Sequence, residues 1–262
     1  MHYIDTHTHV YDPDFRGDML MVSTFMGKKN PLYDGDEDSV EYVARLVNQH
    51  ANTYAILGIY PEFAHHLDID NNIKGLRGII LANRDKVVAI GEIGLDYHCH
   101  PSKTDIVKQQ QLFRAQLELA VSLNLPVALH IRDACENDQA DAFYDIFQVL
   151  SDFPQIRGVC HSFTGNRTSL KKALALGLYV SVNGIYTFNK DPELQATLDS
   201  IPLNRLLLET DAPFLTPIPH RKERNKSSFI PAIAEFVAKS RGITLTEVAT
   251  ITTENAKQLF DI

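Results

Sequence analysis

The feature that most constrains this chain is an alternation of short apolar segments with longer amphipathic ones along its 262 residues. The short segments are rich in β-branched and aliphatic residues, which is typical of strands. The longer segments repeat apolar side chains three and four residues apart, which indicates helices with one buried face. A regular alternation of the two predicts an α/β fold built on a parallel sheet.

The alternation places the predicted elements along most of the chain. The predicted strands are Tyr3–Thr6, Met19–Thr24, Tyr54–Tyr60, Val87–Ile93, Val127–His130, Gly158–His161, Tyr179–Val182 and Leu206–Glu209. The predicted helices are Asp38–Gln49, Asn71–Asn83, Asp105–Leu123, Asp138–Leu150, Thr168–Leu176, Pro192–Ser200 and Phe229–Arg241. This order and length match a (β/α)8 TIM barrel, which we predict as a single domain over residues 1–262.

A doubly wound open sheet is the alternative architecture. Such a sheet usually carries a Gly-rich phosphate loop after its first strand, where this chain has His7-Thr8-His9. The segment Thr216–Ser228 follows the last predicted strand as a long polar loop. Because compact domains seldom keep such loops without a use, we expect this loop to contribute to function.

The composition narrows the class of protein. The chain is 44% hydrophobic and 22% charged, as expected of a globular protein, and no apolar run approaches the length of a membrane span. There is no secretory signal pattern, and Cys99, Cys135 and Cys160 have no CxxC spacing, so we predict reduced thiols and a cytoplasmic location. The formal net charge of −8 argues against a broad basic surface for nucleic acid, but not against a local site where metal ions supply positive charge.

Several ionisable residues stand at or near the ends of predicted strands: His7, His9, Glu92, His130, His161 and Asp211. Taken one at a time, each is more simply explained as a hydrogen-bonded histidine, a salt-bridging carboxylate or a turn residue. Together they fall where a barrel gathers its catalytic side chains, at the carboxyl ends of the strands. We therefore interpret them as one functional site. Five other histidines lack this placement and are interpreted as ordinary, namely His2, His50, His65, His66 and His220.

Four histidines and two carboxylates suit Zn²⁺, Mn²⁺ or Mg²⁺ better than thiol-seeking cations. A carboxylate can bridge two cations about 3.5–4 Å apart, and Glu92 is the candidate bridge. Two such ions polarise a substrate oxygen and activate a water at neutral pH, while Asp211 can bind a cation and accept the proton of that water. Arg132 is placed to contact an anionic group, with a surface salt bridge to Asp133 as the equal alternative. These residues predict metal-assisted hydrolysis.

The motifs of the chain resemble those of the TatD family of metal-dependent deoxyribonucleases, within the amidohydrolase-type TIM barrels. The matching stretches are DTHTH, GEIGLDY, PVALHIRDA, HSFTG, LLLETDAPFLTP and TTENAKQLF. They are spread over nearly the whole chain, and GEIGLDY and LLLETDAP are far more specific than a lone HxH. The resemblance implies a TIM barrel that cleaves phosphodiester bonds in DNA.

Carried over to the matching positions, the resemblance implies a binuclear site with two divalent ions (Mg²⁺, Mn²⁺ or Zn²⁺). One ion is held by His7, His9, Glu92 and Asp211, and the other by Glu92, His130 and His161. Glu92 and Asp211 are then the candidate catalytic residues. The candidate substrate-binding residues are Arg132, Tyr60, Arg224 and Asn225.

The chain departs from the family pattern in two loops. Where G-x-H-P-H is frequent, the sequence is GIYPEF, so Tyr60 and Phe63 replace histidines expected near the substrate. The Tyr60 hydroxyl can donate a hydrogen bond to a phosphate, whereas Phe63 cannot. The loop after the last strand has RNKSS in place of an Arg-Asn-Glu-Pro pattern and keeps Arg224 and Asn225. The segment Asp12–Asn48 matches poorly.

Three functions follow from these observations. The first is a deoxyribonuclease that holds DNA through its metals and a few basic side chains, namely Arg132, Arg221, Lys222 and Arg224. The second keeps the metals but hydrolyses a small ester, amide or phosphoester. The third is a non-catalytic barrel that acts through a partner, a possibility raised by Tyr60 and Phe63. The sequence implies no membrane association and no stable protein partner.

Overall fold

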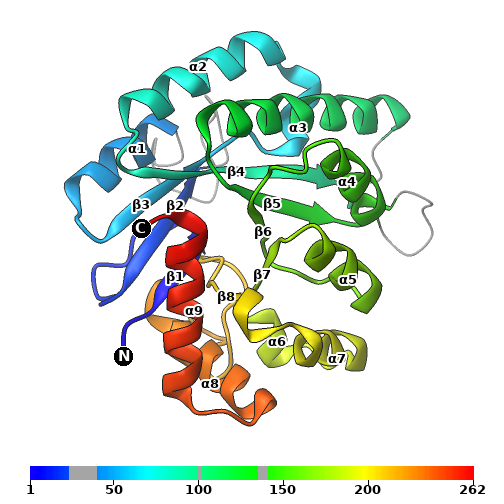
Figure 1. The fold of residues 1–262 in the computed structure, drawn as a ribbon. Helices are drawn as coiled ribbons and strands as arrows, with labels where there is room; N and C mark the ends of the chain where they lie inside the picture. Colours follow the sequence, from blue (N-terminus) through cyan, green and yellow to red (C-terminus); the bar gives the residue numbers. More distant parts are fainter. Residues whose placement is uncertain (24–39, 99–101, 135–140) are drawn as a thin grey trace. The chain divides into compact units, whose positions relative to one another are not determined.

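The computed structural model describes residues 1–23, 40–98, 102–134 and 141–262. Eight parallel strands follow one another in the sheet in sequence order, with helices between them (Figure 1). This arrangement matches a (β/α)8 barrel and confirms the predicted fold class. The strands are β1 (Ile4–Thr8), β2 (Asp18–Ser23), β3 (Thr53–Leu57), β4 (Val87–Asp96), β5 (Val127–Arg132), β6 (Gly158–Cys160), β7 (Tyr179–Val182) and β8 (Leu206–Leu208).

Every predicted helix has a counterpart in the structure. These are α1 (Val40–Gln49), α2 (Ile69–Ala82), α3 (Lys103–Leu123), α4 (Ala142–Ser151), α5 (Arg167–Ala175), α7 (Pro192–Ser200) and α8 (Ile230–Arg241). The elements that the sequence did not predict are α6 (Ile185–Phe188), α9 (Leu245–Phe260) and the 3-10 helices η1 (Pro61–His66), η2 (Leu203–Arg205) and η3 (Ser227–Phe229). Parts of three predicted elements lie outside the described residues: Thr24, Asp38–Ser39 and Asp138–Ala140.

Helix starts follow capping residues rather than the first apolar side chain. Ser102 accepts a hydrogen bond from the backbone N–H of Asp105, whose carboxylate accepts one from the backbone N–H of Ser102. This capping box satisfies donors that the first helical turn leaves without intrahelical partners. As a result α3 begins at Lys103, two residues before the predicted start at Asp105.

Contacts divide the chain into two compact units. The first unit comprises Met1–Met21, Ala51–Tyr54 and Cys160–Ile262. The second comprises Val22–His50 and Ala55–Val159. The single domain over residues 1–262 stays a prediction.

In the second unit, β4 is longer than the sequence predicted. It runs to Asp96, and all its residues are buried. Its register against β5 shifts between Ile90 and Ile93, so one extra residue is inserted where Gly91 and Glu92 lie. Such a bulge re-aims side chains and is frequent beside functional sites. Glu92 therefore lies in the middle of β4, not near its end as predicted.

Gly94 allows β4 to approach β5 at the level of His130. Its φ is +145°, and a Cβ at this position would lie 2.0 Å from the carbonyl oxygen of His130. Only glycine avoids both the strained backbone conformation and the clash. The second glycine of GEIGLDY is thus explained by the placement of His130, which pairs with it across the two strands.

In the first unit, α8 and α9 lie side by side and α9 packs against β8 (Figure 1). Asn255, in the closing TTENAKQLF stretch, donates amide hydrogens to the carbonyl oxygens of Leu203 and Leu206, each at 2.8 Å. A buried amide held by two carbonyls fixes the helix against the strand. This contact gives the closing stretch a structural role.

Asp5 connects β1 to the segment that follows β8. Its carboxylate accepts hydrogen bonds from the backbone N–H of Thr210 at 2.9 Å, from the Thr210 hydroxyl at 2.6 Å and from the Ser227 hydroxyl at 2.6 Å. Asp5 is fully buried, so these donors supply the partners that water cannot. The first residue of DTHTH is therefore a structural anchor for the two histidines that follow it.

Cys160 is free and buried, and burial raises the pKa of its thiol to about 12. Such a thiol stays protonated and unreactive. Cys99 and Cys135 lie outside the described residues. None of the described helices is long and apolar enough to cross a membrane.

Candidate metal centre

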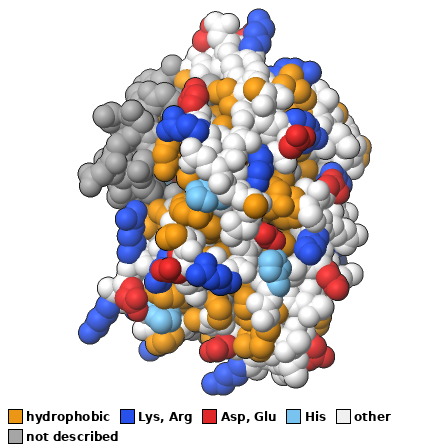
Figure 2. Space-filling model, turned by 90° about the vertical axis from the view of Figure 1, so that its left-hand side faces the viewer, with side chains coloured by type: hydrophobic (Ala, Val, Ile, Leu, Met, Phe, Trp, Pro, Cys, Tyr) orange, Lys and Arg blue, Asp and Glu red, His pale blue; other side chains and the backbone are white. Residues whose placement is uncertain are grey.

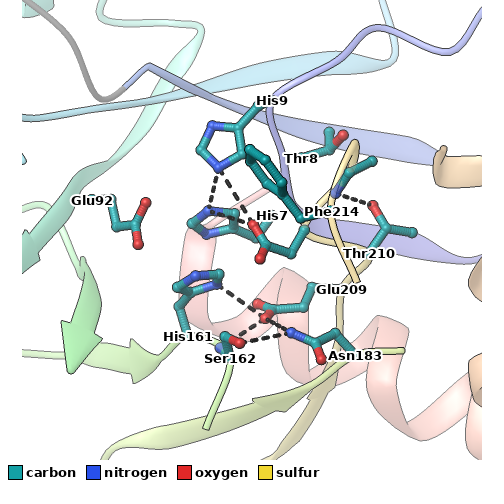
Figure 3. Close-up of polar contacts among 12 residues, drawn as sticks. His7, Thr8, His9, Glu92, His161, Ser162, Asn183, Glu209, Thr210 and Phe214 are labelled. Atoms are coloured by element: carbon teal, nitrogen blue, oxygen red, sulfur yellow. Dashed lines mark hydrogen bonds and ion pairs between the residues drawn. The ribbon is translucent and has the colours of Figure 1, made fainter. Parts of the chain in front are cut away.

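Three predicted ligands come together in the first unit. The Nε2 atoms of His7 and His9 are 3.3 Å apart (Figure 3). Oδ1 of Asp211 lies 3.4 Å from His9 Nε2 and 3.9 Å from His7 Nε2. Ligand atoms bound about 2.0–2.2 Å from one cation lie roughly 3.0–3.5 Å apart, so this spacing is close to that of a shared divalent ion. Imidazole and carboxylate donors also fit such an ion chemically.

Backbone geometry explains why these side chains meet. His7 lies in β1 and His9 just beyond it, and alternate residues of a strand point to the same side. Asp211 has a left-handed backbone with φ 56°, which aspartate tolerates better than most residues. Its N–H donates to the His7 carbonyl at 2.9 Å, and the His9 N–H donates to the Ala212 carbonyl at 2.8 Å. The turn after β8 is thus hydrogen-bonded to the backbone on both sides of Thr8, the last residue of β1.

His161 joins the same group by stacking on His7. Their ring centroids are 3.5 Å apart and the planes differ by 14° (Figure 3). Nδ1 of His161 lies 3.0 Å from Oε1 of Glu209. A carboxylate on one ring nitrogen fixes the tautomer in which the other nitrogen binds a metal. Glu209 therefore lies beside Nδ1 of His161, which leaves Nε2 as the ring nitrogen that this carboxylate does not face.

Glu209 is itself held by three further donors. The Ser162 N–H donates to Oε1 at 2.7 Å and the Asn183 amide to Oε1 at 3.2 Å (Figure 3). The Ser181 hydroxyl donates to Oε2 at 2.5 Å. The carboxylate is buried, where it is costly without hydrogen-bond donors. These contacts fix its direction toward His161.

In the second unit, His130 lies between two carboxylates. Its Nδ1 is 2.6 Å from Oε1 of Glu92 and its Nε2 is 2.8 Å from Oδ2 of Asp96. Both carboxylates come from β4, and His130 comes from β5. Two predicted ligands, Glu92 and His130, are therefore adjacent. The structure adds Asp96, which the sequence interpretation did not select.

The Tyr60 hydroxyl belongs to the same group. It donates to Oδ2 of Asp96 at 2.7 Å and lies 2.9 Å from Nε2 of His130. The sequence predicted that this hydroxyl would contact a phosphate. In the structure its position is explained by the buried carboxylate of Asp96, which needs hydrogen-bond donors. Tyr60 therefore contacts Asp96 and His130, and its contact with a substrate stays a prediction.

Charges in this group shift the protonation of its members. Burial lowers the pKa of His130, but the carboxylates of Glu92 and Asp96 outweigh burial and raise it to about 9. Burial raises the pKa of Asp96, but hydrogen bonds from His130 and Tyr60 outweigh burial and lower it to about 2. Burial and the carboxylates of Glu92 and Asp96 also raise the pKa of Tyr60 far above its ordinary value. The surroundings of His130 thus favour positive charge at this position.

The predicted arginines are exposed. Arg132 lies at the end of β5, and Arg224 lies in the loop after β8. Asp133, the alternative partner of Arg132, accepts a hydrogen bond from the backbone N–H of Ala142 at 2.7 Å and so stabilises the start of α4. Both arginines remain candidate contacts for an anionic substrate.

Asn225 makes hydrogen bonds within the segment that follows β8. It is buried, and its amide donates to the carbonyl oxygens of Thr210 at 2.8 Å and Phe214 at 2.5 Å. Its own side-chain oxygen accepts from the Lys226 N–H at 2.9 Å. Asn225 therefore shapes the loop after β8, and its contact with a substrate stays a prediction.

Three of the histidines interpreted as ordinary make ion pairs with carboxylates outside the candidate ligands. These pairs are His2–Asp18 at 2.9 Å, His65–Asp105 at 3.1 Å and His220–Glu223 at 2.8 Å.

Asp96 and Glu209 are the functional candidates that the sequence interpretation missed. Asp96 ends GEIGLD, and Glu209 ends the apolar run LLLE just before Asp211. Both are buried. A carboxylate that terminates an apolar run needs a partner, which is the criterion that selected Glu92 and Asp211. The same criterion, applied to the other acid of each motif, identifies both residues.

Phe214 is an exposed aromatic residue next to the ligands. Its side chain is 41% exposed, and its ring lies 6.1 Å from the His9 ring at an angle of 71° (Figure 3).

Figure 2 shows one face of the molecule, where Lys and Arg side chains are interspersed with Asp and Glu. On the described part of that face the basic side chains do not merge into one patch. Attraction of an anion therefore depends on local groups.

Comparison with known proteins adds four findings. A family model described as TatD related DNase matches residues 4–261. YabD of Bacillus subtilis strain 168, an uncharacterized metal-dependent hydrolase, is 35% identical over 265 residues, with 98% of each chain covered. A Rahnella protein named 3'-5' ssDNA/RNA exonuclease TatD is 38% identical over 231 residues, covering 86% of this chain and 83% of the other. The crystal structure of YJJV, a TatD homologue from Escherichia coli K12, has a TM-score of 0.80 at 25% identity, covering 99% of this chain and 98% of that one.

Proposed function

The chain belongs to the TatD-related DNase family of metal-dependent hydrolases, and from this premise we propose that it cleaves phosphodiester bonds in DNA. The observation that carries the proposal is the convergence of His7, His9 and Asp211, whose donor atoms all lie within 4.8 Å of one another. The relative named as an ssDNA/RNA exonuclease supports a nucleic-acid substrate.

Two divalent ions, Mg²⁺, Mn²⁺ or Zn²⁺, are part of the proposal. His7, His9, Asp211 and Glu92 would hold one ion, and Glu92, His130 and His161 would hold the other. This assignment follows the family pattern and the general rule that a barrel gathers ligands at the carboxyl ends of its strands. The close contacts within each unit support it, because each unit presents imidazole and carboxylate donors together.

The residues of the chain have distinct tasks in this reaction. When bound, the ions supply positive charge to the phosphoryl group and lower the pKa of a water molecule. The Asp211 carboxylate accepts the proton of the attacking water. Glu209 keeps His161 in one orientation. Arg132 and Arg224, both exposed, contact the phosphates of the substrate.

A substrate panel tests the proposed function. Metal-loaded protein is assayed with Mg²⁺, Mn²⁺ or Zn²⁺ on a single-stranded DNA oligonucleotide, a small phosphodiester, a carboxylic ester and a cyclic amide. We expect cleavage of the oligonucleotide and the small phosphodiester, with about two metal ions per chain by elemental analysis. Cleavage of only the carboxylic ester or the amide would overturn the nuclease assignment. No hydrolysis of any substrate would favour the barrel that acts through a partner.

Replacing Phe214 by Ala tests whether nucleobases contact this site. We expect KM for single-stranded DNA to rise by about 10-fold, because an exposed aromatic ring provides a stacking surface for a base. An oligonucleotide with abasic residues at the cleaved end should show no such increase. Ile218→Ala is the matched control, since Ile218 is 50% exposed in the same loop but has no ring. Equal KM values for Phe214→Ala and the unmodified protein on normal DNA would exclude the stacking role.

A further inference from the structure

Asp96 is not one of the proposed metal ligands, yet it contacts His130, which is one of them. Glu92 occupies the Nδ1 side of the imidazole at 2.6 Å, and Asp96 occupies the Nε2 side at 2.8 Å. Asp96 is buried, so the fold places a costly carboxylate behind a candidate ligand. The position of the Asp96 carboxylate beside His130 therefore needs a functional explanation.

Asp96 is fixed at both carboxylate oxygens. Oδ2 accepts from the Tyr60 hydroxyl at 2.7 Å, and Oδ1 accepts from the His98 N–H at 3.0 Å. The Tyr60 ring also meets the edge of the His130 ring, with centroids 4.7 Å apart and planes at 63°. The imidazole is therefore restrained by a hydrogen bond and by ring packing.

Two buried glutamines of α3 hold the backbone of this group in the same way. The Gln109 side chain accepts from the Asp96 N–H at 2.9 Å and donates to the Asp96 carbonyl at 2.9 Å. The Gln116 side chain accepts from the Ile59 N–H at 2.7 Å and donates to the Ile59 carbonyl at 2.9 Å. The glutamines are about two helical turns apart, so they share one face of α3. One fixes Asp96, and the other fixes the residue before Tyr60.

We propose that Asp96 and Tyr60 are positioning residues that orient His130 for metal binding through Nδ1, and that Gln109 and Gln116 keep them in place. The inference rests on the proposed function. A cation that replaced the proton on Nδ1, beside the Glu92 carboxylate, would leave Nε2–H to donate to Asp96. Tyr60 stands where the family pattern has a histidine, so in this chain a hydroxyl supports the carboxylate behind the ligand.

Metal titration of conservative variants tests the inference. Zn²⁺ affinity is measured by competition with a chromophoric chelator for Asp96→Ala, Asp96→Asn and Tyr60→Phe. We expect one of the two ions to bind about 10–100-fold more weakly in Asp96→Ala, because loss of such a partner has this effect on metal sites. Asp96→Asn should lose less, since its amide oxygen still accepts from Nε2–H. Tyr60→Phe should lose the least, and the visible spectrum of the Co²⁺-loaded protein should change in all three.

The same unit offers a matched control pair. The Tyr97 hydroxyl donates to Asp145 at 2.9 Å, in a pair of the same chemistry that contacts none of the candidate ligands. Tyr97→Phe and Asp145→Asn therefore remove an equivalent hydrogen bond or charge. We expect both controls to bind both ions as the unmodified protein does and to give the same Co²⁺ spectrum.

The outcomes separate this inference from the proposed function. Weaker binding of one ion in the Asp96 and Tyr60 variants, with unchanged controls, supports the inference even if no phosphodiester is cleaved. Unchanged affinity and an unchanged Co²⁺ spectrum in Asp96→Asn and Tyr60→Phe would overturn it, even if the protein is a nuclease. Equal weakening in the controls would also overturn it, because the effect would then be a general loss of stability.

Discussion

Replacing Asp211 by Asn is expected to lower the rate of phosphodiester hydrolysis by about 10²–10⁴-fold while leaving the fold intact. The substitution removes the charge of a candidate metal ligand, which is also the proposed proton acceptor, but keeps the shape of the side chain. Asparagine also adopts the left-handed backbone that Asp211 has, with φ 56°, at low cost. The backbone hydrogen bonds from Asp211 to His7 and from Phe214 to Asp211 do not involve the side chain.

Asp191→Asn is the matched control for this prediction. Asp191 caps α7 by accepting a hydrogen bond from the Glu193 N–H at 2.9 Å, and asparagine caps helices as well as aspartate does. The control removes the same charge from the same unit without touching a candidate ligand. Rates on single-stranded DNA, thermal unfolding and metal content are measured for both variants. If Asp211→Asn retains the full rate, Asp211 takes no part in the chemistry and its proposed role as proton acceptor is wrong.

The fold could be predicted from the sequence because its strands and helices have periodic patterns of apolar residues. The helix Pro192–Ser200 has the predicted bounds, since Asp191 and Pro192 form a recognisable start. The end of β4 was misplaced because Gly94 and Asp96 look like breakers of a strand. Gly94 is required there by the approach of the His130 backbone, a contact between segments that no local pattern reports. The single turn of α6 is too short to show a helical period.

The residues of the candidate site likewise fall into those that the sequence interpretation selected and those that it missed. Residues that can bind metal directly were selected, because an ionisable side chain after an apolar run is conspicuous. Asp96 and Glu209 were missed because they act on His130 and His161, and such partnerships depend on side-chain directions. Tyr60 and Asn225 have hydrogen-bond partners that the sequence did not predict, and their contact with a substrate stays a prediction. Their hydrogen-bond partners, Asp96 for Tyr60 and Thr210 for Asn225, lie 36 and 15 positions away in the chain.

Replacing Asp5 by Ala is expected to lower the free energy of unfolding by about 3–5 kcal/mol. The substitution leaves the Thr210 N–H, the Thr210 hydroxyl and the Ser227 hydroxyl without the carboxylate that accepts from all three. All of these residues are buried, so water replaces the lost acceptor poorly. Urea unfolding followed by circular dichroism measures the change, and an unchanged slope with urea shows that the unfolded state is not altered.

Variants that lack one hydrogen-bond donor show how much unfolding free energy a single one of these hydrogen bonds contributes. Ser227→Ala and Thr210→Val each delete one hydroxyl but keep the carboxylate, so each should cost only about 1–2 kcal/mol. If the loss in Asp5→Ala does not exceed that in Ser227→Ala, Asp5 is not the anchor between β1 and the segment after β8. Asp5 lies two residues before His7, and the His7 N–H is 3.4 Å from its carboxylate. Metal affinity should therefore fall in Asp5→Ala even where the protein remains folded, whereas Ser227→Ala should retain it.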